Sequence, residues 1–262
     1  SSMTMAVRLL REYGNRYELK FIYANTGFEH EKTLEFLDRC DRHYQLGLIW
    51  VESVVNPIKK KGTTHKVVTY ETAHRGGGVA EPVIDKFGIY NKAYPHCTRE
   101  MKLQPMVSYM KSIGWGKEYR AIGLRFDDGD FARVRDTASE DRILYPLVDF
   151  FPMDKEDVMD WWQDQPFDLE VEEHEGNCVN CWKKSDKKIM RLIASDAHTS
   201  QFEFLARMER DKGLCGENRD GTKRVFFRGN RSTETMMKLT ESMPELDFGD
   251  YDRCATESCE VY

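Results

Sequence analysis

"LKFIYANTGFEHEKTLEFLDRCDRHYQLGLIWVESVV", residues 19–55, is the stretch that decides the fold class. Its first apolar run, LKFIYA, ends in a polar turn, as buried strands commonly do. Helical spacing follows, with Leu34, Leu37, Cys40 and Tyr44 on one face, and LGLIWVESVV is a second apolar run. We therefore predict a strand–helix–strand unit of a parallel sheet, with Cys40 in its core.

Further apolar patterns predict more helices and strands around this unit. The fold class we expect is α/β: an open, mostly parallel sheet of the Rossmann-like kind with helices on both faces, plus a smaller C-terminal appendage. The additional helices are expected at 2–14, 98–114, 153–165 and 189–210, and the additional strands at 118–126 and 143–150.

Composition divides the chain into one large domain and a tail. Residues 1–210 form the expected α/β domain, and residues 211–262, which are polar and contain Gly and Arg, form a peripheral extension. Within the domain, residues 53–95 are rich in Lys, Gly, Thr and Pro, which indicates a long, partly irregular insertion. FFRGNRSTETMMKL, residues 226–239, predicts a strand followed by a helix capped by Ser232.

Charge and cysteine content exclude several protein classes. The 262 residues include 40% apolar and 32% charged residues with a net charge of −6, which argues against a generally basic nucleic-acid binder. We see no membrane span and no signal peptide. The seven cysteines, an odd number, favour a reducing compartment, so we expect a cytoplasmic protein.

The polar turn after the first strand of this stretch is a candidate ligand site. In open α/β sheets, ligands bind at the carboxyl edge of the strands, where Asn25, Thr26, Gly27 and Glu29 lie. An ordinary turn with a local helix cap is the alternative. At the start of the chain, Ser1 and Ser2 precede a helix, where they either cap it or contact an anion.

A second candidate anion site follows the predicted strand at 118–126. IGLRFDDGDFARVRD, residues 122–136, places Arg125 at the carboxyl end of that strand, with Arg133 and Arg135 farther on. Guanidinium groups at such a place suit phosphate or sulfate. The aspartates between them make a solvated salt-bridge loop an equally good alternative.

The stretch HEGNCVNCWKKS, residues 174–185, carries Cys178 and Cys181 in a C-x-x-C frame. In a reducing compartment this frame indicates a metal site, an iron–sulfur cluster or a redox dithiol more often than a disulfide. Cys97 is a credible third ligand, since it stands at the start of a predicted helix. The fourth ligand stays open between His96, Cys215, Cys254, Cys259 and an exogenous group.

Together these stretches resemble the phosphoadenosine phosphosulfate (PAPS) reductase family, a branch of the PP-loop nucleotide-binding proteins. ANTGFEHEKTLEF (24–36) looks like the family's second nucleotide-site motif, and AIGLRFDD (121–128) like its I-G-I-R segment, with Gly123 and Arg125 in place. LYPLVDFFPMDKEDVMDWW (144–162) is similar to its H-P-L-x-D-W stretch. CTREMKLQP (97–105) with the later CVNC (178–181) resembles the cysteine pattern of cluster-containing adenylyl-sulfate (APS) reductases.

The resemblance implies the cofactors and site residues. It implies an adenine nucleotide, PAPS, APS or ATP, and a 4Fe–4S cluster, with zinc as the alternative. The cluster ligands would be Cys97, Cys178 and Cys181. The implied nucleotide-site residues are Ser1, Ser2, Asn25, Thr26, Gly27, Glu29, Lys102, Gly123, Arg125 and Arg135.

Three features depart from the family pattern. Only the end of the S-G-G-x-x-S loop is visible, at Ser1 and Ser2, and Thr98 stands where a second tandem cysteine is expected. The E-C-G-x-H tail with the reductases' nucleophile is replaced by CATESCEVY, so Cys259 is only a weak candidate for the catalytic nucleophile.

Three functions follow as expectations. The first is reduction of an adenylyl sulfate by a thiolate, with a thiol reductant such as thioredoxin as partner. The second is ATP-dependent sulfur transfer to nucleic acid, for which NPIKKKGTTHK (56–66) supplies a local basic segment. The third is a nucleotide-binding or structural module without catalysis. No membrane partner is expected, and homo-oligomer formation stays open.

Overall fold

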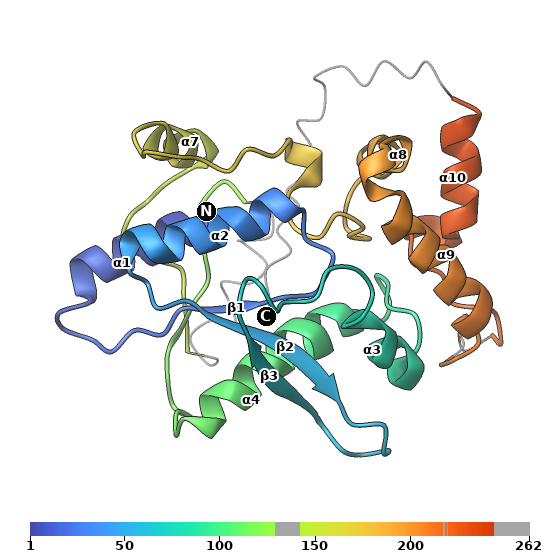
Figure 1. Cartoon of the computed structure of the whole chain (residues 1–262), viewed down its shortest axis with the longest axis horizontal. Helices are drawn as coiled ribbons and strands as arrows, with labels where there is room; N and C mark the ends of the chain where they lie inside the picture. Colours follow the sequence, from blue (N-terminus) through green and yellow to red (C-terminus); the bar gives the residue numbers. More distant parts are fainter. Residues whose placement is uncertain (129–141, 217, 219, 244–262) are drawn as a thin grey trace.

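The stretch 19–55 forms the predicted β–α–β unit in the computed structural model of the protein, which describes residues 1–128, 142–216, 218 and 220–243 (Figure 1). Strand β1 (Ile22–Ala24) pairs in parallel with β2 (Ile49–Val55), and helix α2 (Glu31–Tyr44) connects them. The register aligns Ile22 with Ile49 and Ala24 with Val51. The chain is therefore of mixed α and β structure, as the apolar pattern predicts.

Helix α2 begins and ends at residues that satisfy its backbone. His30 is the N-cap, and its Nδ1 accepts a hydrogen bond from the N–H of Lys32. Gln45 ends the helix in the left-handed conformation. On the inner face Cys40 is fully buried, and burial raises the pKa of its thiol to about 12. The prediction that Cys40 belongs to the core is confirmed.

The strands form two small sheets. Strand β3 (Thr63–Val68) pairs antiparallel with β2, giving the order β1-β2-β3. Strands β4 (Arg120–Ala121) and β5 (Ile143–Leu144) form a separate parallel pair. Both are shorter than predicted, and Pro146 starts the short helix α6 (Pro146–Asp149) within the second predicted strand.

The range 53–95 is partly irregular, as predicted, but it also contains the end of β2 together with strand β3 and helix α3 (Ala80–Phe87), and the sequence did not predict β3 or α3. Strand β3 alternates only weakly in hydrophobicity, since Lys66 and Thr64 face solvent at an edge of the sheet. Because the alternation is weak, this strand is not predicted from the apolar runs of the sequence.

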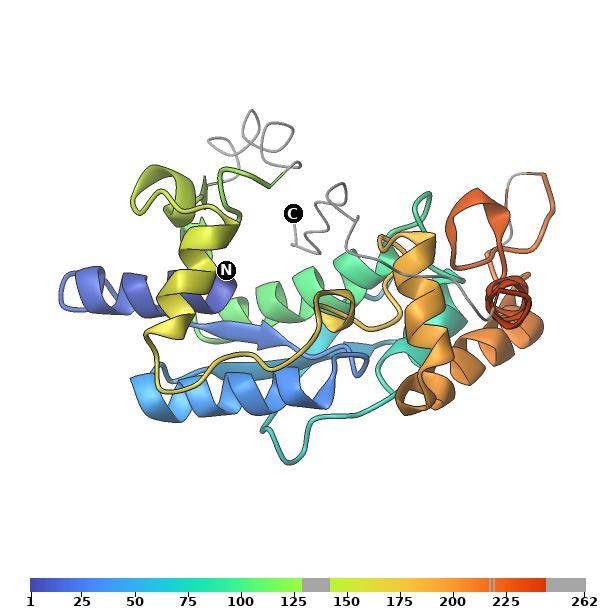
Figure 2. The same cartoon turned by 90° about the horizontal axis from the view of Figure 1, so that it is seen from above.

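Helices lie on both faces of the three-stranded sheet. Helix α2 lies on one face and α4 (Gln104–Ser112) on the other, as both views show (Figures 1 and 2). A π-helix, η1 (Cys97–Leu103), runs directly into α4. Helix α1 (Ser2–Tyr13) packs against α2, α6 and α7 (Lys155–Gln163). Trp162 is buried in the hydrophobic cluster between these helices and donates its indole N–H to Thr4 Oγ1 at 2.9 Å.

The C-terminal helices form a cluster at one end of the sheet (Figure 1). Helix α10 (Thr233–Glu241) packs on α8 (Asp186–Ala194) and α9 (Thr199–Lys212), and its predicted cap is confirmed, because Ser232 accepts a hydrogen bond from the N–H of Thr235. Short 3₁₀ helices η2 (Glu173–Glu175), η3 (Asp196–His198) and η4 (Arg228–Asn230) join these elements.

Residues 211–243 are not peripheral where the structure describes them. Phe226, Phe227 and Met236 are buried in the largest hydrophobic core cluster. The buried carboxylate of Glu209 accepts hydrogen bonds from two backbone N–H groups of this segment, Phe226 at 2.8 Å and Thr233 at 2.7 Å. Helix α9 also crosses the boundary expected at residue 210, and η4 replaces the strand expected at 226. Within the described residues, no helix has the length and apolar character needed to cross a membrane.

Candidate functional site

The polar turn after β1 is held by a buried hydrogen-bond network. Asn25 is fully buried, and its amide donates to Glu52 Oε1 at 2.6 Å and to the carbonyl of His74 at 2.9 Å. Its Oδ1 accepts from the N–H of Gly27 at 3.3 Å. These bonds use both amide protons, so Asn25 fixes the turn, and contact of its side chain with a nucleotide stays a prediction.

Gly27 is required where the turn meets the loop that precedes α3. Its φ is +81°, a conformation that L side chains rarely adopt. A Cβ atom there would lie 2.3 Å from the carbonyl oxygen of Gly76. The N–H of Gly76 donates in turn to the carbonyl of Gly27 at 2.6 Å. The glycine-rich loop at 75–78 is therefore packed directly against the turn.

Thr26 and Glu29 connect the same turn to the C-x-x-C segment. Thr26 Oγ1 donates to Glu29 Oε1 at 2.7 Å and lies 3.3 Å from Cys178 Sγ. The thiol of Cys178 donates to the same carboxylate oxygen at 3.4 Å. The backbones also meet, because Val179 N donates to the carbonyl of Phe28 at 2.8 Å. Two motifs about 150 residues apart thus form one site.

Tyr90 shares its surroundings with the three predicted metal ligands. It is buried, and its pKa is raised well above the ordinary value first by burial and then by the charges of cysteine side chains. Those cysteines are Cys97, Cys178 and Cys181. The indole N–H of Trp182 donates to Cys97 Sγ at 3.4 Å. The three cysteines therefore lie in one region of the structure, and their role as metal ligands stays a prediction.

Spacing between the sulfur atoms matters for the kind of metal site. In the part of the chain that the structure describes, the three cysteine sulfurs do not all lie within 4.8 Å of one another. A single zinc ion with bonds of about 2.3 Å to sulfur sets sulfur–sulfur separations of about 3.8 Å. Holding zinc would thus require these thiols to move closer, whereas a multi-iron cluster spans a wider set of ligands.

The serines at the chain start meet the predicted I-G-I-R segment. A Cβ atom on Gly123 would lie 2.7 Å from Ser2 Cα, so only glycine permits this approach of the strand end to the N-terminus of α1. Arg125 Nη1 donates to Ser1 Oγ at 2.8 Å. Ser1 is the N-cap residue, but its side chain does not cap the helix. These four residues form a second group at the N-terminus of α1.

Arg125 is engaged by acidic side chains, as the salt-bridge alternative anticipates. Its guanidinium bonds Asp127 at 2.8 Å and Asp128 at 2.9 Å. Asp127 also accepts from the N–H of Lys155 at 3.3 Å, and Lys155 Nζ pairs with Glu173 at 3.2 Å. Glu173 lies in η2, just before the C-x-x-C, so a chain of polar contacts runs from the N-terminal group toward the cysteine segment.

The remaining predicted residues are placed as follows. Lys102 lies in the π-helix that begins at Cys97. Such helices occur often at functional sites. The thiol of Cys215, one candidate fourth ligand, donates to the carbonyl of Asp85 at 3.1 Å. Arg135 and Cys259 lie outside the described residues, as do Arg133 and Cys254.

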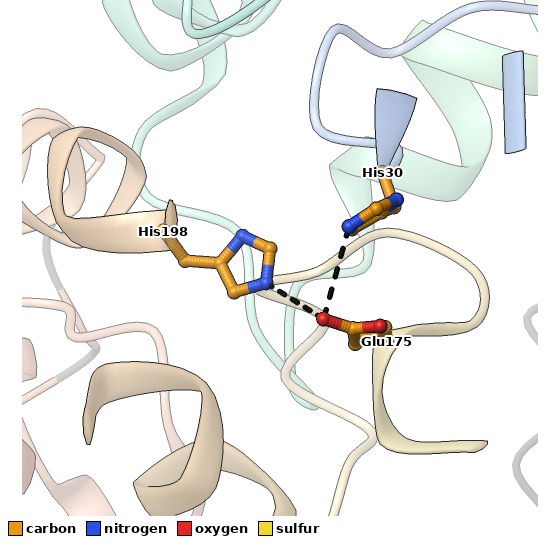
Figure 3. A group of neighbouring side chains, drawn as sticks. All are labelled: His30, Glu175 and His198. Carbon is orange, nitrogen blue, oxygen red and sulfur yellow. Dashed lines mark hydrogen bonds and ion pairs between the residues drawn. The ribbon is translucent and has the colours of Figure 1, made fainter. Parts of the chain in front are cut away.

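A further cluster, of His30, Glu175 and His198, had no signal in the sequence, because its members come from three distant segments. His198 Nε2 lies 3.3 Å and His30 Nε2 3.7 Å from the same oxygen, Glu175 Oε1. Figure 3 shows both imidazole rings turned toward this carboxylate. The ligand atoms of the three side chains all lie within 4.8 Å of one another.

Comparison with known proteins finds a relative that aligns with nearly the whole chain. No family model matches the chain, and no solved structure matches it. The chain is 28% identical over 263 residues to the uncharacterized nin region protein ORF290 of Escherichia phage lambda, covering 94% of this chain and 86% of that protein. The similarity extends over nearly the whole chain.

Proposed function

We propose that the chain is a nucleotide-dependent enzyme of sulfur chemistry, of the PAPS reductase type, that reduces an adenylyl sulfate by means of a thiolate. The observation that carries the proposal is the junction of Thr26 and Glu29 with Cys178. It joins the turn at the carboxyl end of a parallel strand, where nucleotides bind in such folds, to a thiol. A nucleotide held at this turn would present its anionic end near the cysteines.

The arrangement of strands supports the finer fold on which this proposal rests. Both β1–β2 and β4–β5 are parallel pairs, and helix α2 connects the strands of the first pair. Helices α2 and α4 cover opposite faces of the larger sheet (Figure 2). We infer that the two pairs belong to one open, mostly parallel sheet, with β3 as an antiparallel addition at its edge.

The N-terminal group is the proposed phosphate or sulfate site. Helix α1 is twelve residues long, and Gly123 lets the strand end approach its first turn at Ser2. Backbone N–H groups at a helix N-terminus bind anions, and a guanidinium group adds bidentate hydrogen bonds. Arg125 would exchange its contact with Asp127, which is partly exposed, for the nucleotide's anionic end.

The cysteine set suits a cysteine-ligated iron–sulfur cluster. Cys97, Cys178 and Cys181 would hold it, and the Trp182 N–H already donates to one of these sulfurs. Within the C-x-x-C turn, Asn180 Nδ2 is buried and has no hydrogen-bond partner among the described residues, so it is a donor left over for a bound group. When bound, a 4Fe–4S cluster would fix the three cysteines in place beside the anionic substrate. Zinc is the alternative, with the sulfur spacing against it.

The proposed reaction balances with a thiol reductant. A cysteine thiolate attacks the sulfur of the adenylyl sulfate, forming an S–S bond while the S–O bond to the nucleotide phosphate breaks, and the nucleoside monophosphate or bisphosphate leaves. One thiolate of a dithiol reductant such as thioredoxin then attacks the cysteine sulfur, so that sulfite leaves and a mixed disulfide forms. The reductant's second thiol attacks its own sulfur in that mixed disulfide, which releases the cysteine thiolate and leaves the reductant as a disulfide. Cys259 is the proposed nucleophile, although its surroundings lack the family motif.

A second candidate is ATP-dependent sulfur transfer to nucleic acid. Thr98 follows Cys97 where the reductases have a second tandem cysteine, so three cysteine ligands would leave one iron open to a substrate sulfur. Under this alternative the chain binds tRNA or DNA with an affinity that falls steeply with salt. A nucleotide-binding or structural module without catalysis is the third candidate, and the internal use of the Asn25 amide favours its structural form.

Calorimetric titration of the full chain with PAPS, APS and ATP, under anaerobic conditions, tests the proposal. We expect a sulfonucleotide to bind and Arg125→Ala to weaken its binding at least tenfold, while Arg207→Ala, whose guanidinium pairs with Glu81 on the surface, serves as the matched control. Tighter binding of ATP, together with salt-dependent RNA binding, would favour sulfur transfer. Binding of none of the three nucleotides would refute both enzymatic functions.

A further inference from the structure

We propose that His30, Glu175 and His198 bind a zinc ion, at a site separate from the cysteine set (Figure 3). The three side chains converge from the N-terminus of α2, from η2 and from the end of η3. Two imidazoles and one carboxylate are a ligand set that zinc takes in proteins, with a fourth position left for water or another ligand. The site does not depend on the proposed function.

The distances between the ligand atoms fit a tetrahedral ion. Zinc bonds of about 2.0–2.1 Å to nitrogen and oxygen set ligand–ligand separations of about 3.3–3.4 Å. The separations from Glu175 Oε1 are 3.3 Å to His198 Nε2 and 3.7 Å to His30 Nε2. The first separation is also within hydrogen-bonding range, whereas the second lies beyond it. An ion between the three ligand atoms would engage both histidines.

The carboxylate is oriented by a backbone group, as metal ligands usually are. Glu175 Oε2 accepts a hydrogen bond from the N–H of Glu172 at 3.2 Å, which leaves Oε1 turned toward the two histidines.

The histidines differ in their surroundings. The His198 side chain is 4% exposed and lies in the interior. The His30 side chain is 19% exposed and borders solvent, where a fourth ligand can enter.

His30 couples the site to the start of α2. Its Nδ1 now accepts the hydrogen bond from the N–H of Lys32, which places the ring proton on Nε2. Binding of zinc through Nε2 moves that proton to Nδ1 and releases this cap. The loss is small beside a zinc–imidazole bond, and the helix keeps the bond from the N–H of Thr33 to the carbonyl of His30.

A zinc ion at this place would also fix the cysteine segment. Glu175 precedes Cys178 by three residues, and His30 follows Glu29, the carboxylate that the Cys178 thiol contacts. The ion would clamp the loop before the C-x-x-C to the turn after β1 and to the start of α9.

Cobalt(II) titration of the tag-free, anaerobically purified protein tests the site, because cobalt replaces zinc and its spectrum reports the ligands. Thiolate ligands add a sulfur-to-cobalt charge-transfer band in the near ultraviolet, and nitrogen and oxygen ligands do not. The variants are Glu175→Gln and His198→Ala, which each remove one ligand, and Cys178→Ala, which disables the cysteine set. His174→Gln is the matched control, since that neighbouring histidine pairs with Glu172 instead.

We expect the histidine cluster to bind one equivalent of four-coordinate Co(II) in Cys178→Ala, without a charge-transfer band. In His174→Gln the histidine cluster should also bind one equivalent. In both Glu175→Gln and His198→Ala, the affinity of the histidine cluster for cobalt falls at least tenfold. Circular dichroism shows whether each variant folds, and if one does not, the folded variant alone tests the site. The proposal is overturned if Cys178→Ala binds no four-coordinate cobalt, or if both ligand variants bind it as the wild type does. The cluster would then be a hydrogen-bonded His–Glu–His clasp.

Discussion

Replacement of Gly27 by alanine probes how tightly the turn after β1 is fitted to the loop at 75–78. Two costs follow from the structure. The positive φ of +81° is strained for a residue with a Cβ atom, by about 1–2 kcal/mol. The new Cβ atom would also lie 2.3 Å from the carbonyl oxygen of Gly76, which must retreat by about 1 Å to reach ordinary contact at 3.4 Å. That retreat breaks the 2.6 Å hydrogen bond from Gly76 N to Gly27 O, worth about 1 kcal/mol.

We therefore expect Gly27→Ala to lower the free energy of unfolding by about 2–3 kcal/mol. Gly47→Ala is the matched control, because Gly47 also has a positive φ, of +65°, but no atom lies within 4 Å of the added Cβ. It should cost only the conformational part, about 1–2 kcal/mol.

Urea unfolding of both variants and the wild type, followed by circular dichroism at one pH, measures the difference. The account predicts that Gly27→Ala is the less stable variant by at least about 1 kcal/mol, the part assigned to the close contact with the loop. Equal destabilisation by the two substitutions would refute the reasoning, because it would mean that the loop at 75–78 does not restrain the turn.

Three further changes have definite expected outcomes. Burial raises the pKa of Glu209 to about 7 from the ordinary 4.5, so the folded state binds this proton more tightly, and the free energy of unfolding falls by up to about 3 kcal/mol as pH rises through that window. Glu209→Gln should flatten this dependence in urea unfolding at pH values across the window, and an unchanged slope would contradict it. Trp162→Phe removes the bond to Thr4 and should cost about 2 kcal/mol by the same assay, with Trp161→Phe as the control that should cost less. Gly123→Ala should displace the first turn of α1 at Ser2 and weaken nucleotide binding in calorimetry at least tenfold, and undiminished affinity would remove that turn from the site.

Local signals in the sequence were sufficient for the elements that depend on nearby residues. The β1–α2–β2 unit follows from its apolar runs, and the burial of Cys40 follows from its place on the helix face. The helix predicted at 153–165 forms as α7, and Asp154 and Asp157 form a capping box at its start. In each case the determining residues lie within one or two helical turns.

Long-range contacts were not predictable in the same way. Strand β3 forms by pairing with the edge of β2, and its own residues alternate only weakly in hydrophobicity. The cysteine spacing selects three side chains whose role as ligands stays a prediction, and neither the burial of Tyr90 beside them nor the contact of Glu29 with Cys178 can be recognised from local spacing. The histidine cluster is the extreme case, because its three members are separated by more than 20 residues each.

The measurement that tests the central claim most directly is the iron, acid-labile sulfide and zinc content of the anaerobically purified chain, with its absorption spectrum. Cys178→Ala removes one proposed ligand, and Cys40→Ala is the matched control at a thiol buried in the core. The account predicts about four irons and four sulfides per chain, with a broad visible band that is lost in Cys178→Ala and kept in Cys40→Ala. Zinc that persists in Cys178→Ala belongs to the histidine cluster. Absence of iron from the wild type, or the same iron content in Cys178→Ala, would contradict the account.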